Sequence, residues 1–294
     1  MILRGVTTQA EEGLRLDEAA PRLFPSLSRG EVRRIIERGG CVVGGSMSRV
    51  ASRRVKPGEE IVLGVMEAGR FSDFFLTPEL VLYEDADYLA VNKPAGINAQ
   101  RTPYQLCGTM EYAVTRWFRE RGIADPARIV HRLDRGTSGV MLFPKSRQAA
   151  AHLSTVFASG GVEKRYWALV TGGAPGETWE ADGAIGKVGT ARYGVTSPGK
   201  PARTLFRVLF ASERGALLEC IPLTGRTHQI RVHLSHRRLP IVGDSTYGGE
   251  PAPRMMLHCR AMSFRTPSGS TVSAVADPGH DFLAACLALG VTPP

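Results

Sequence analysis

The stretch Thr204-Leu-Phe-Arg-Val-Leu-Phe-Ala211, continued by Ser212-Glu-Arg214 and Gly215-Ala-Leu-Leu-Glu-Cys-Ile-Pro-Leu223, sets the pattern for most of this chain. Two runs rich in branched and aromatic residues flank three polar residues, which is typical of two paired strands and their turn. A similar pair is expected over 256–264 and 271–275, around Pro267-Ser-Gly269. The sequence therefore predicts hairpins that follow one another along the chain.

Further strands are predicted over 81–83, 88–91, 129–133, 140–143 and 164–170. One helix is expected from Ser146 to Gly160, with Ser146 as its cap and Leu153 on its apolar side. Hairpins with a few helices between them predict an α+β domain with a mixed, largely antiparallel sheet and flanking helices. A doubly wound parallel sheet is not expected.

The N-terminal part of the chain has a different pattern. Leu16, Ala19, Ala20 and Leu23 form one helical stripe, and a second helix begins at Ser28-Arg-Gly-Glu31, a capping box. Short strands are expected at 41–43 and within 55–63. Nine basic residues and two acids lie between Arg22 and Lys56, so this segment carries seven of the nine net positive charges of the chain. Such a concentration indicates a phosphate-backbone partner, whereas a merely solvated basic face is the alternative.

Length and composition exclude several classes of protein. The chain has 294 residues, 43% hydrophobic and 22% charged, which is ordinary globular composition. We find no run of about 20 apolar residues and no apolar leader, so a cytoplasmic protein without a membrane segment is expected. The five cysteines are scattered and never form a Cys-x-x-Cys pair, so neither a disulfide framework nor a zinc site is expected.

Three stretches contain the residues that are suited to chemistry. In His131-Arg-Leu-Asp-Arg-Gly-Thr-Ser-Gly139, Asp134 follows a predicted strand and opens a loop, although an Asp near a Gly is commonly only a turn residue. In Glu163-Lys-Arg-Tyr-Trp-Ala-Leu-Val170, strand alternation places Lys164 and Tyr166 on one face. That tyrosine suits stacking on a base, or simply a half-buried core position.

The third stretch is Thr224-Gly-Arg-Thr-His-Gln-Ile-Arg-Val-His-Leu-Ser-His236, whose periodicity fits either a helix or a strand. Arg226 and Arg231 are candidates to bind phosphate or to pair with a carboxylate. The three histidines of this stretch fit none of the usual zinc spacings, so we expect no metal site.

The N-terminal segment resembles the alpha-L RNA-binding domain through Arg15-Leu-Asp17, Ser28-Arg29, Ile35-Ile36, Gly39 and Val55-Lys-Pro-Gly58. The remainder resembles the RluA-type pseudouridine synthases. The motifs that carry this second resemblance, over about residues 79–276, are Lys93-Pro-Ala-Gly96, His131-Arg-Leu-Asp134 with Thr137-Ser-Gly139, Lys164 with Tyr166, Gly199-Lys-Pro-Ala202, Gly225-Arg-Thr-His-Gln-Ile-Arg-Val-His233 and Pro240-Ile-Val-Gly-Asp244. The domains implied are 12–65 for RNA binding, 66–78 as linker, 79–280 for catalysis around a central cleft, and 281–294 as a tail.

These resemblances imply isomerisation of uridine to pseudouridine in RNA, without a metal or other cofactor. Asp134 would be the essential carboxylate, Arg231 its partner with Arg226 as the fallback, and Tyr166 the residue that stacks on the uracil. Arg132 would fill the space left by a flipped-out nucleotide. The residues expected to contact RNA are Arg132, Arg29, Arg33, Arg34, Arg226 and Lys164.

Ribosomal RNA of the large subunit is the expected substrate, and the enzyme is expected to act as a monomer. The alternatives are a transfer RNA uridine, a non-catalytic RNA-binding or ribosome-assembly factor on the same fold, and a glycosidic-bond hydrolase. The last would need a second carboxylate near Asp134, and the sequence offers no obvious one.

Overall fold

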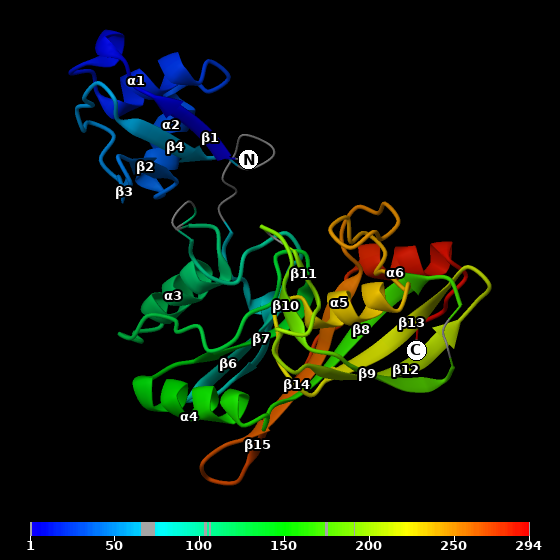
Figure 1. The fold of residues 1–294 in the computed structure, drawn as a ribbon. Coiled ribbons are helices and arrows are strands. Elements are labelled where there is room, and N and C mark those ends of the chain that lie inside the picture. The colour runs from blue at the N-terminus through cyan, green and yellow to red at the C-terminus, as the bar shows by residue number, and fades with distance from the viewer. Residues whose placement is uncertain are drawn as a thin grey trace. The chain divides into compact units, whose positions relative to one another are not determined.

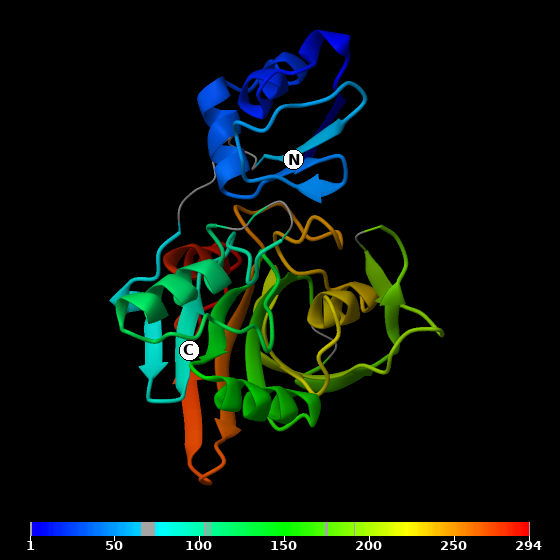
Figure 2. The same ribbon diagram turned by 90° about the vertical axis from the view of Figure 1, so that its left-hand side faces the viewer.

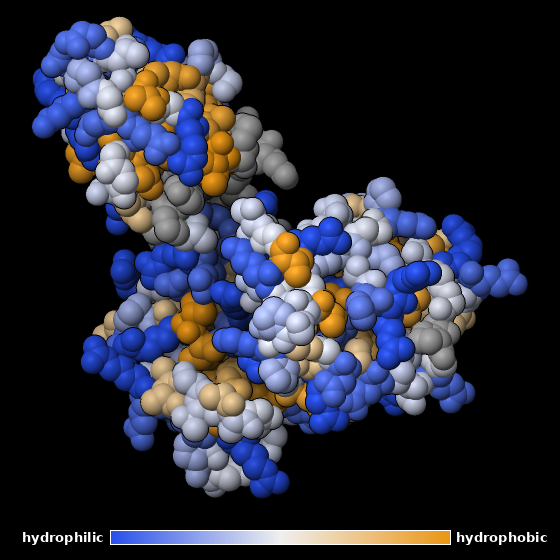
Figure 3. Space-filling model, viewed as in Figure 1, coloured by the Kyte–Doolittle hydropathy of each residue, from blue (hydrophilic) through white to orange (hydrophobic). Residues whose placement is uncertain are grey.

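The computed structural model describes residues 2–65, 74–102, 105, 107–173, 176–190 and 192–293. The chain forms two compact units. The first comprises residues 1–76 and 98–124, and the second comprises residues 77–97 and 125–294. The space-filling view shows hydrophilic surface interspersed with hydrophobic patches (Figure 3). Within the described ranges, no helix has the length and apolarity to cross a bilayer.

The first unit packs two helices against a small sheet (Figure 1). The sheet has the order β1-β4-β2-β3, from β1 (Ile2–Val6), β2 (Cys41–Val43), β3 (Ser46–Met47) and β4 (Glu60–Gly64). The helices are α1 (Leu16–Leu23) and α2 (Arg29–Glu37), and Ser28 caps α2 through the predicted capping box. Leu16 and Ile36 of their apolar stripes are fully buried, and Leu23 is partly buried against the same core. The exposed side of α2 is consequently left to its arginines. Short helix η1 (Gln9–Glu11) and helix α3 (Met110–Glu120) also belong to this unit.

The second unit is built on a nine-stranded sheet, in which β15 pairs only with β14 and the others have the order β5-β6-β7-β14-β8-β13-β12-β9 (Figures 1 and 2). The strands are β5 (Val81–Glu84), β6 (Tyr88–Lys93), β7 (Ser138–Pro144), β8 (Glu163–Thr171), β9 (Thr178–Asp182), β12 (Arg203–Ala211), β13 (Gly215–Pro222), β14 (Leu257–Arg265) and β15 (Thr271–Val275). All neighbours are antiparallel except β7 and β14. The predicted α+β fold with a mixed, largely antiparallel sheet is confirmed.

Helices cover both faces of this sheet. On one face lie α4 (Arg147–Ala158) and α5 (Gln229–His236), with β10 (Ile185–Lys187) and β11 (Tyr193–Val195) beside α5. On the other face lies α6 (His280–Ala288), whose Phe282 is fully buried with its ring 6.2 Å from that of His258. Short helix η2 (Pro78–Leu80) precedes β5. The stretch around His228, which fitted either a helix or a strand, forms the helix α5.

The parallel contact between β7 and β14 requires a glycine. Gly139 pairs with Cys259, and a Cβ at position 139 would lie only 2.1 Å from the carbonyl oxygen of Cys259. Its φ of +110° is also one that side chains rarely adopt. This close approach fixes β7, and with it the end of the loop that carries Asp134.

The predicted strand over 129–133 is wrong, because this segment is irregular. The backbone amide of Leu142 on β7 donates to Nε2 of His131 at 2.8 Å, so the side chain of His131 occupies the hydrogen-bonding edge that a strand would need. Two elements lie outside the domain limits expected from the sequence: β1 precedes residue 12, and α6 falls within the expected tail of 281–294. The limits 12–65 for the RNA-binding domain, 66–78 for the linker and 79–280 for the catalytic domain remain proposals. Most of the linker lies outside the described residues.

Candidate active site

A cavity of about 780 Å³ opens on the face of the second unit that α4 and α5 border. Its walls come from the irregular segment before β7, from the end of α4, from β8, and from the segment that leads into α5. The residues predicted for chemistry that line it are Arg132, Asp134, Lys164, Tyr166, Arg226 and Arg231. Six side chains separated by up to about a hundred residues are thus brought to one cavity.

Asp134 and Arg231 form an ion pair at the base of this site. Nη1 of Arg231 donates to Oδ2 of Asp134 at 2.8 Å, and the Asp134 side chain keeps 27% of its surface exposed. The backbone carbonyl of Asp134 accepts the amide of Thr137 at 3.0 Å, which closes the turn. A partly exposed carboxylate held by one strong donor remains available to a ligand.

Arg231 is held in turn by a buried carboxylate. Its Nε and Nη2 donate to the two carboxylate oxygens of Asp244 at 2.7 and 2.9 Å, and the Asp244 side chain is only 1% exposed. Burial would lower the pKa of Arg231, but the hydrogen bonds and charges of Asp244 and Asp134 outweigh it and hold the pKa above its usual value. Arg231 is therefore a fixed cation, oriented by Asp244 and directed at Asp134. The sequence analysis placed Asp244 within a motif but gave it no role.

The buried side chain of Lys93 holds the backbone next to Asp134. Its side chain is fully buried, and its Nζ donates to the carbonyls of Pro94 at 2.9 Å, Ile97 at 2.8 Å and Arg135 at 3.4 Å. Burial lowers the pKa of Lys93 to about 7, against an opposing effect of the Asp134 charge. The amide of Gly96 also donates to the carbonyl of Arg135 at 2.7 Å. Two loops from separate parts of the chain are tied together at the residue after Asp134.

Tyr166 and Lys164 project from β8 into the cavity, as alternation along the strand predicted. Tyr166 pairs in register with Cys220 on β13 and with Cys259 on β14. Burial raises the pKa of Tyr166 well above its usual value, with smaller effects from Cys259 and Asp134. Burial also lowers the pKa of Lys164. The phenol of Tyr166 consequently keeps its proton at neutral pH.

Arg132 and Arg226 lie at the exposed rim of the cavity. Nη2 of Arg132 donates to Oγ1 of Thr227 at 3.3 Å, and Nε of Arg226 donates to the carbonyl of Pro201 at 2.9 Å. Arg226 therefore bonds to backbone, and the partner of Asp134 is Arg231. Both rim guanidinium groups stay accessible to an anionic ligand.

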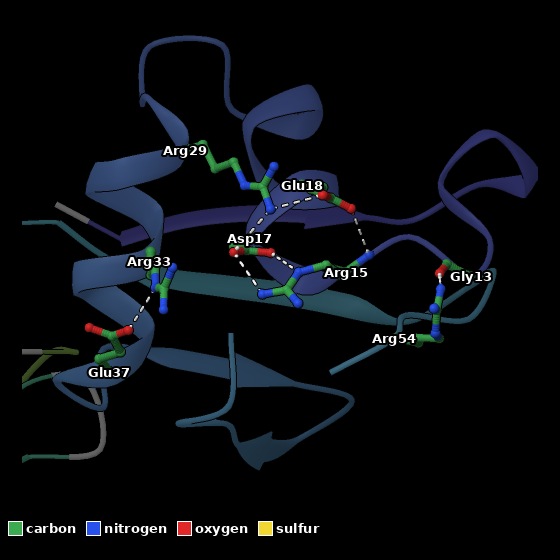
Figure 4. Close-up of polar contacts among 8 residues, drawn as sticks. All are labelled: Gly13, Arg15, Asp17, Glu18, Arg29, Arg33, Glu37 and Arg54. Atoms are coloured by element: carbon green, nitrogen blue, oxygen red, sulfur yellow. Dashed lines mark hydrogen bonds and ion pairs between the residues drawn. The ribbon is translucent and has the colours of Figure 1, made fainter. Parts of the chain in front are cut away.

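The three arginines predicted on α2 belong to the first unit and differ in their partners, and Figure 4 shows the contacts of two of them, Arg29 and Arg33. Arg29 pairs with Glu18 at 2.8 Å and, at 3.5 Å, with the buried Asp17, which Arg15 also binds. Arg33 pairs with Glu37 one turn along the helix at 2.8 Å. Arg34 is exposed and has no ion pair or side-chain hydrogen bond within the described part of the chain. Among these three, Arg34 has the guanidinium that is least committed.

The three histidines of the third stretch have separate partners. His228 lines the cavity and its Nδ1 lies 2.9 Å from the hydroxyl of Tyr247. Nδ1 of His233 lies 3.0 Å from Oγ1 of Thr204, and His236 is exposed. His228 lies in a motif of the family resemblance and was considered for chemistry only as a metal ligand. Its left-handed backbone conformation has no signal in the sequence.

Comparisons with known proteins agree with this geometry. Residues 87–236 match the family model described as RNA pseudouridylate synthase. A ribosomal large subunit pseudouridine synthase D of Nitrosomonas europaea is 32% identical, over 94% of this chain and 84% of that protein. A ribosomal large subunit pseudouridine synthase C of Escherichia coli O157:H7 is 30% identical, over 95% and 94%. An uncharacterized RNA pseudouridine synthase of Chloroflexus aurantiacus is 39% identical, over 82% and 77%.

Solved structures share the fold. The human RNA pseudouridylate synthase domain containing 4 superposes with a TM-score of 0.64 at 23% identity, over 74% of this chain and 95% of that one. The human RNA pseudouridylate synthase domain containing 1 gives a TM-score of 0.56 at 26% identity, over 73% and 96%. From the family match, the relatives and the cavity that gathers the predicted residues, we conclude that this chain belongs to the RNA pseudouridine synthase family.

Proposed function

We propose that this pseudouridine synthase isomerises uridine in ribosomal RNA of the large subunit, with Asp134 as the reacting carboxylate. The observation that carries the proposal is the ion pair between Asp134 and Arg231 in a cavity that also contains Tyr166. Relatives named as synthases of the large ribosomal subunit support the choice of RNA. A transfer RNA uridine is the alternative substrate.

The reaction breaks the N1–C1′ bond of uridine and forms a C5–C1′ bond, while C5 loses a proton and N1 gains one. Substrate and product are isomers, so the balance needs no oxidant, reductant or cofactor. Asp134 either attacks C1′ or removes a ribose proton to give a glycal, and both routes need an ionised carboxylate, with which Arg231 forms its ion pair. Tyr166 would stack on the detached uracil. Its raised pKa favours stacking over direct removal of the C5 proton.

The arginines divide into two roles in this proposal. A uridine inside a stacked helix cannot reach Asp134, so the nucleotide is flipped out, and we assign Arg132 to the vacated space. Arg226 and Lys164 would contact the RNA backbone near the cavity. In the first unit, which we propose as an RNA-binding domain, the exposed side of α2 would bind phosphates through Arg33 and Arg34, with Arg29 held mainly by its own carboxylates.

Release of tritium from C5 tests the activity. The wild type is incubated with large-subunit ribosomal RNA transcribed with uridine tritiated at C5, and in a second arm with labelled transfer RNA. We expect label in water from the first RNA, none with Asp134→Asn, and wild-type release with Asp277→Asn, whose side chain is 89% exposed. Full activity of Asp134→Asn would overturn the assignment, and release from transfer RNA alone would transfer it to the other substrate.

We also propose that the protein acts as a cytoplasmic monomer. Analytical ultracentrifugation at the concentrations used for the assay tests the oligomeric state, and a dimer would contradict it. Cell fractionation tests the location, and a membrane-bound fraction would contradict that part.

A further inference from the structure

His228 stands out among the residues of the cavity because of its backbone. It precedes α5 with φ of 57° and ψ of 21°, the left-handed conformation. Among the described residues other than glycine, only Arg238 shares a positive φ. This conformation is unfavourable for a residue with a Cβ, and it persists only where the surroundings hold it. The position of the His228 ring is therefore imposed by the fold.

Two tyrosines hold that ring. Nδ1 of His228 lies 2.9 Å from the hydroxyl of Tyr247, and the same hydroxyl accepts the backbone amide of Tyr193 at 3.1 Å. The rings of Tyr193 and Tyr247 each meet the imidazole edge to face, with centroids 5.5 and 5.6 Å away. Only 19% of the His228 side chain is exposed. The imidazole is thus clamped, with Nε2 on its free side.

The contacts also decide which nitrogen carries the proton. The Tyr247 hydroxyl can accept from the Tyr193 amide and still donate its own proton to Nδ1, which suits a proton on Nε2. Nε2 lies 3.8 Å from Oδ2 of Asp134, and a lone pair on Nε2 would be repelled by that carboxylate. Burial lowers the pKa of His228, and Arg231 and Arg132 lower it further against the opposing charges of Asp134 and Asp244, so the ring is neutral near pH 7. The neutral ring therefore points an N–H at Asp134.

Arg231 and His228 approach the same oxygen of Asp134. Nη1 of Arg231 is 2.8 Å and Nε2 of His228 is 3.8 Å from Oδ2. Oδ1 accepts no hydrogen bond from the residues that the structure describes. A separation of 3.8 Å is longer than a hydrogen bond, but catalytic hydrogen bonds are often long without substrate and shorten in the complex. Both donors then hold one oxygen and leave the other for the reaction.

We propose that His228 is a positioning residue for this reaction: its Nε2–H, fixed by Tyr247, holds Oδ2 of Asp134 so that Oδ1 faces the ribose of the flipped nucleotide. This inference rests on the proposed function, because it gives Asp134 the reacting role. It adds a residue whose contribution is orientation, with no proton transferred to or from the substrate.

Rescue by a conservative variant separates this role from a structural one. In His228→Gln the amide nitrogen lies as many bonds from Cα as Nε2 does, so a donor is kept, whereas His228→Asn tolerates the left-handed backbone but its amide is too short to reach. Under single-turnover conditions with saturating tritiated large-subunit RNA, we expect His228→Asn to be roughly 10- to 100-fold slower, with RNA affinity within about twofold of wild type. His228→Gln should recover most of the rate. His236→Asn, the same change at the exposed end of α5, should match wild type.

A double-mutant cycle tests the link to Tyr247. If Tyr247 acts through His228, Tyr247→Phe slows the wild type several-fold but slows His228→Gln or His228→Asn no further. An unchanged rate for His228→Asn, equal rates for Asn and Gln, or additive losses with Tyr247→Phe would each overturn the proposal. If a melting experiment shows that His228→Asn is unfolded, the rates of Tyr247→Phe, of His228→Gln and of their combination still test the proposal. No release by the wild type on any RNA would instead remove the proposed function.

Discussion

Arg231 in the cavity and Arg33 on α2 bind carboxylates at the same distance, 2.8 Å, yet their surroundings differ completely. The Arg231 side chain is 9% exposed and lies between two carboxylates, whereas the Arg33 side chain is 59% exposed and bonds to Glu37, itself 52% exposed. Removing one partner of a buried pair strands a charge away from water, but an exposed charge is simply solvated again. The cost of breaking each ion pair is therefore set by its burial and not by its distance.

The difference suits the two proposed tasks. Binding to many phosphates requires cations that can exchange one partner for another at little cost, as exposed arginines do. Chemistry at one carbon atom requires a carboxylate with a fixed orientation. Three short hydrogen bonds, from Arg231 to Asp244 and to Asp134, fix the orientation of Asp134. The same residue type thus serves a solvated surface in one unit and a fixed site in the other.

Asp244→Asn should give the largest effect of this comparison. It leaves Arg231 buried with one neutral partner in place of a carboxylate, so we expect a loss of about 3–5 kcal/mol in the free energy of unfolding of the second unit. Isomerisation should fall by roughly 100-fold, since Asp134 loses its oriented partner. Urea denaturation and tritium release measure the two losses. Glu37→Gln, the same chemical change at the exposed pair, should cost less than about 0.5 kcal/mol. Similar costs at the two positions would contradict the ranking by burial.

His258 is a buried histidine of the second unit that makes its stability depend on pH. It is fully buried in the sheet, with Nδ1 2.9 Å from Oγ of Ser138 and Nε2 2.9 Å from the carbonyl of Ala276, and burial lowers its pKa from 6.5 to about 4. Between pH 6.5 and 4, His258 is protonated in the unfolded chain but stays neutral in the folded chain. The free energy of unfolding is therefore unaffected by this histidine above pH 6.5 and decreases as the pH falls, by about 2 kcal/mol at pH 5.

We expect His258→Gln, which keeps a donor and an acceptor, to lose about 2 kcal/mol less than wild type between pH 7 and pH 5. Urea denaturation at the two pH values measures this difference. His280→Gln, at an exposed position, should keep the wild-type pH dependence. An unaltered slope in His258→Gln would show that this histidine is not held neutral by the fold.

Sequence reasoning reached the parts of this molecule that follow from periodicity and from motifs. The hairpin of β12 and β13 lies where branched and aromatic runs predicted it, and the Ser28 capping box begins α2. The resemblance placed Asp134, Tyr166 and Arg231 in one site, and the structure brings all three to one cavity. Those residues belong to motifs whose spacing survives in the sequence itself.

The remainder depended on packing between distant segments. The expected strand over 129–133 is displaced because the imidazole of His131 takes the amide of Leu142, which no local pattern reveals. The burial of Lys93 beneath two loops and the bidentate hold of Asp244 on Arg231 arise only when the sheet is assembled. The imidazole of His228 is likewise held by Tyr247 and Tyr193, which come from distant parts of the sequence.

The exposed side of α2 should show the smallest effects, and they should be electrostatic. Arg34→Ala is expected to change the free energy of unfolding by less than about 0.5 kcal/mol, because its side chain is exposed and has no partner within the described residues. Each phosphate contact that is lost should reduce the slope of log affinity against log salt by about 0.7–0.9. Filter binding of a large-subunit RNA transcript over a range of salt concentrations measures it.

Changes to Arg33, Arg34 and Glu37 on this face should alter the RNA affinity in different directions and by different amounts. Arg34→Ala should lower the affinity and the salt slope more than Arg33→Ala does, because Glu37 already neutralises Arg33. Glu37→Gln should raise the affinity, since it frees Arg33 for phosphate, and Arg33→Ala with Arg34→Ala should flatten the slope more than Arg34→Ala alone, by between one and two contacts. If the double variant keeps the wild-type slope, the RNA does not contact this face of α2. The solvated arginines would then serve only solubility, and the contrast with Arg231 would be one of burial without a difference in task.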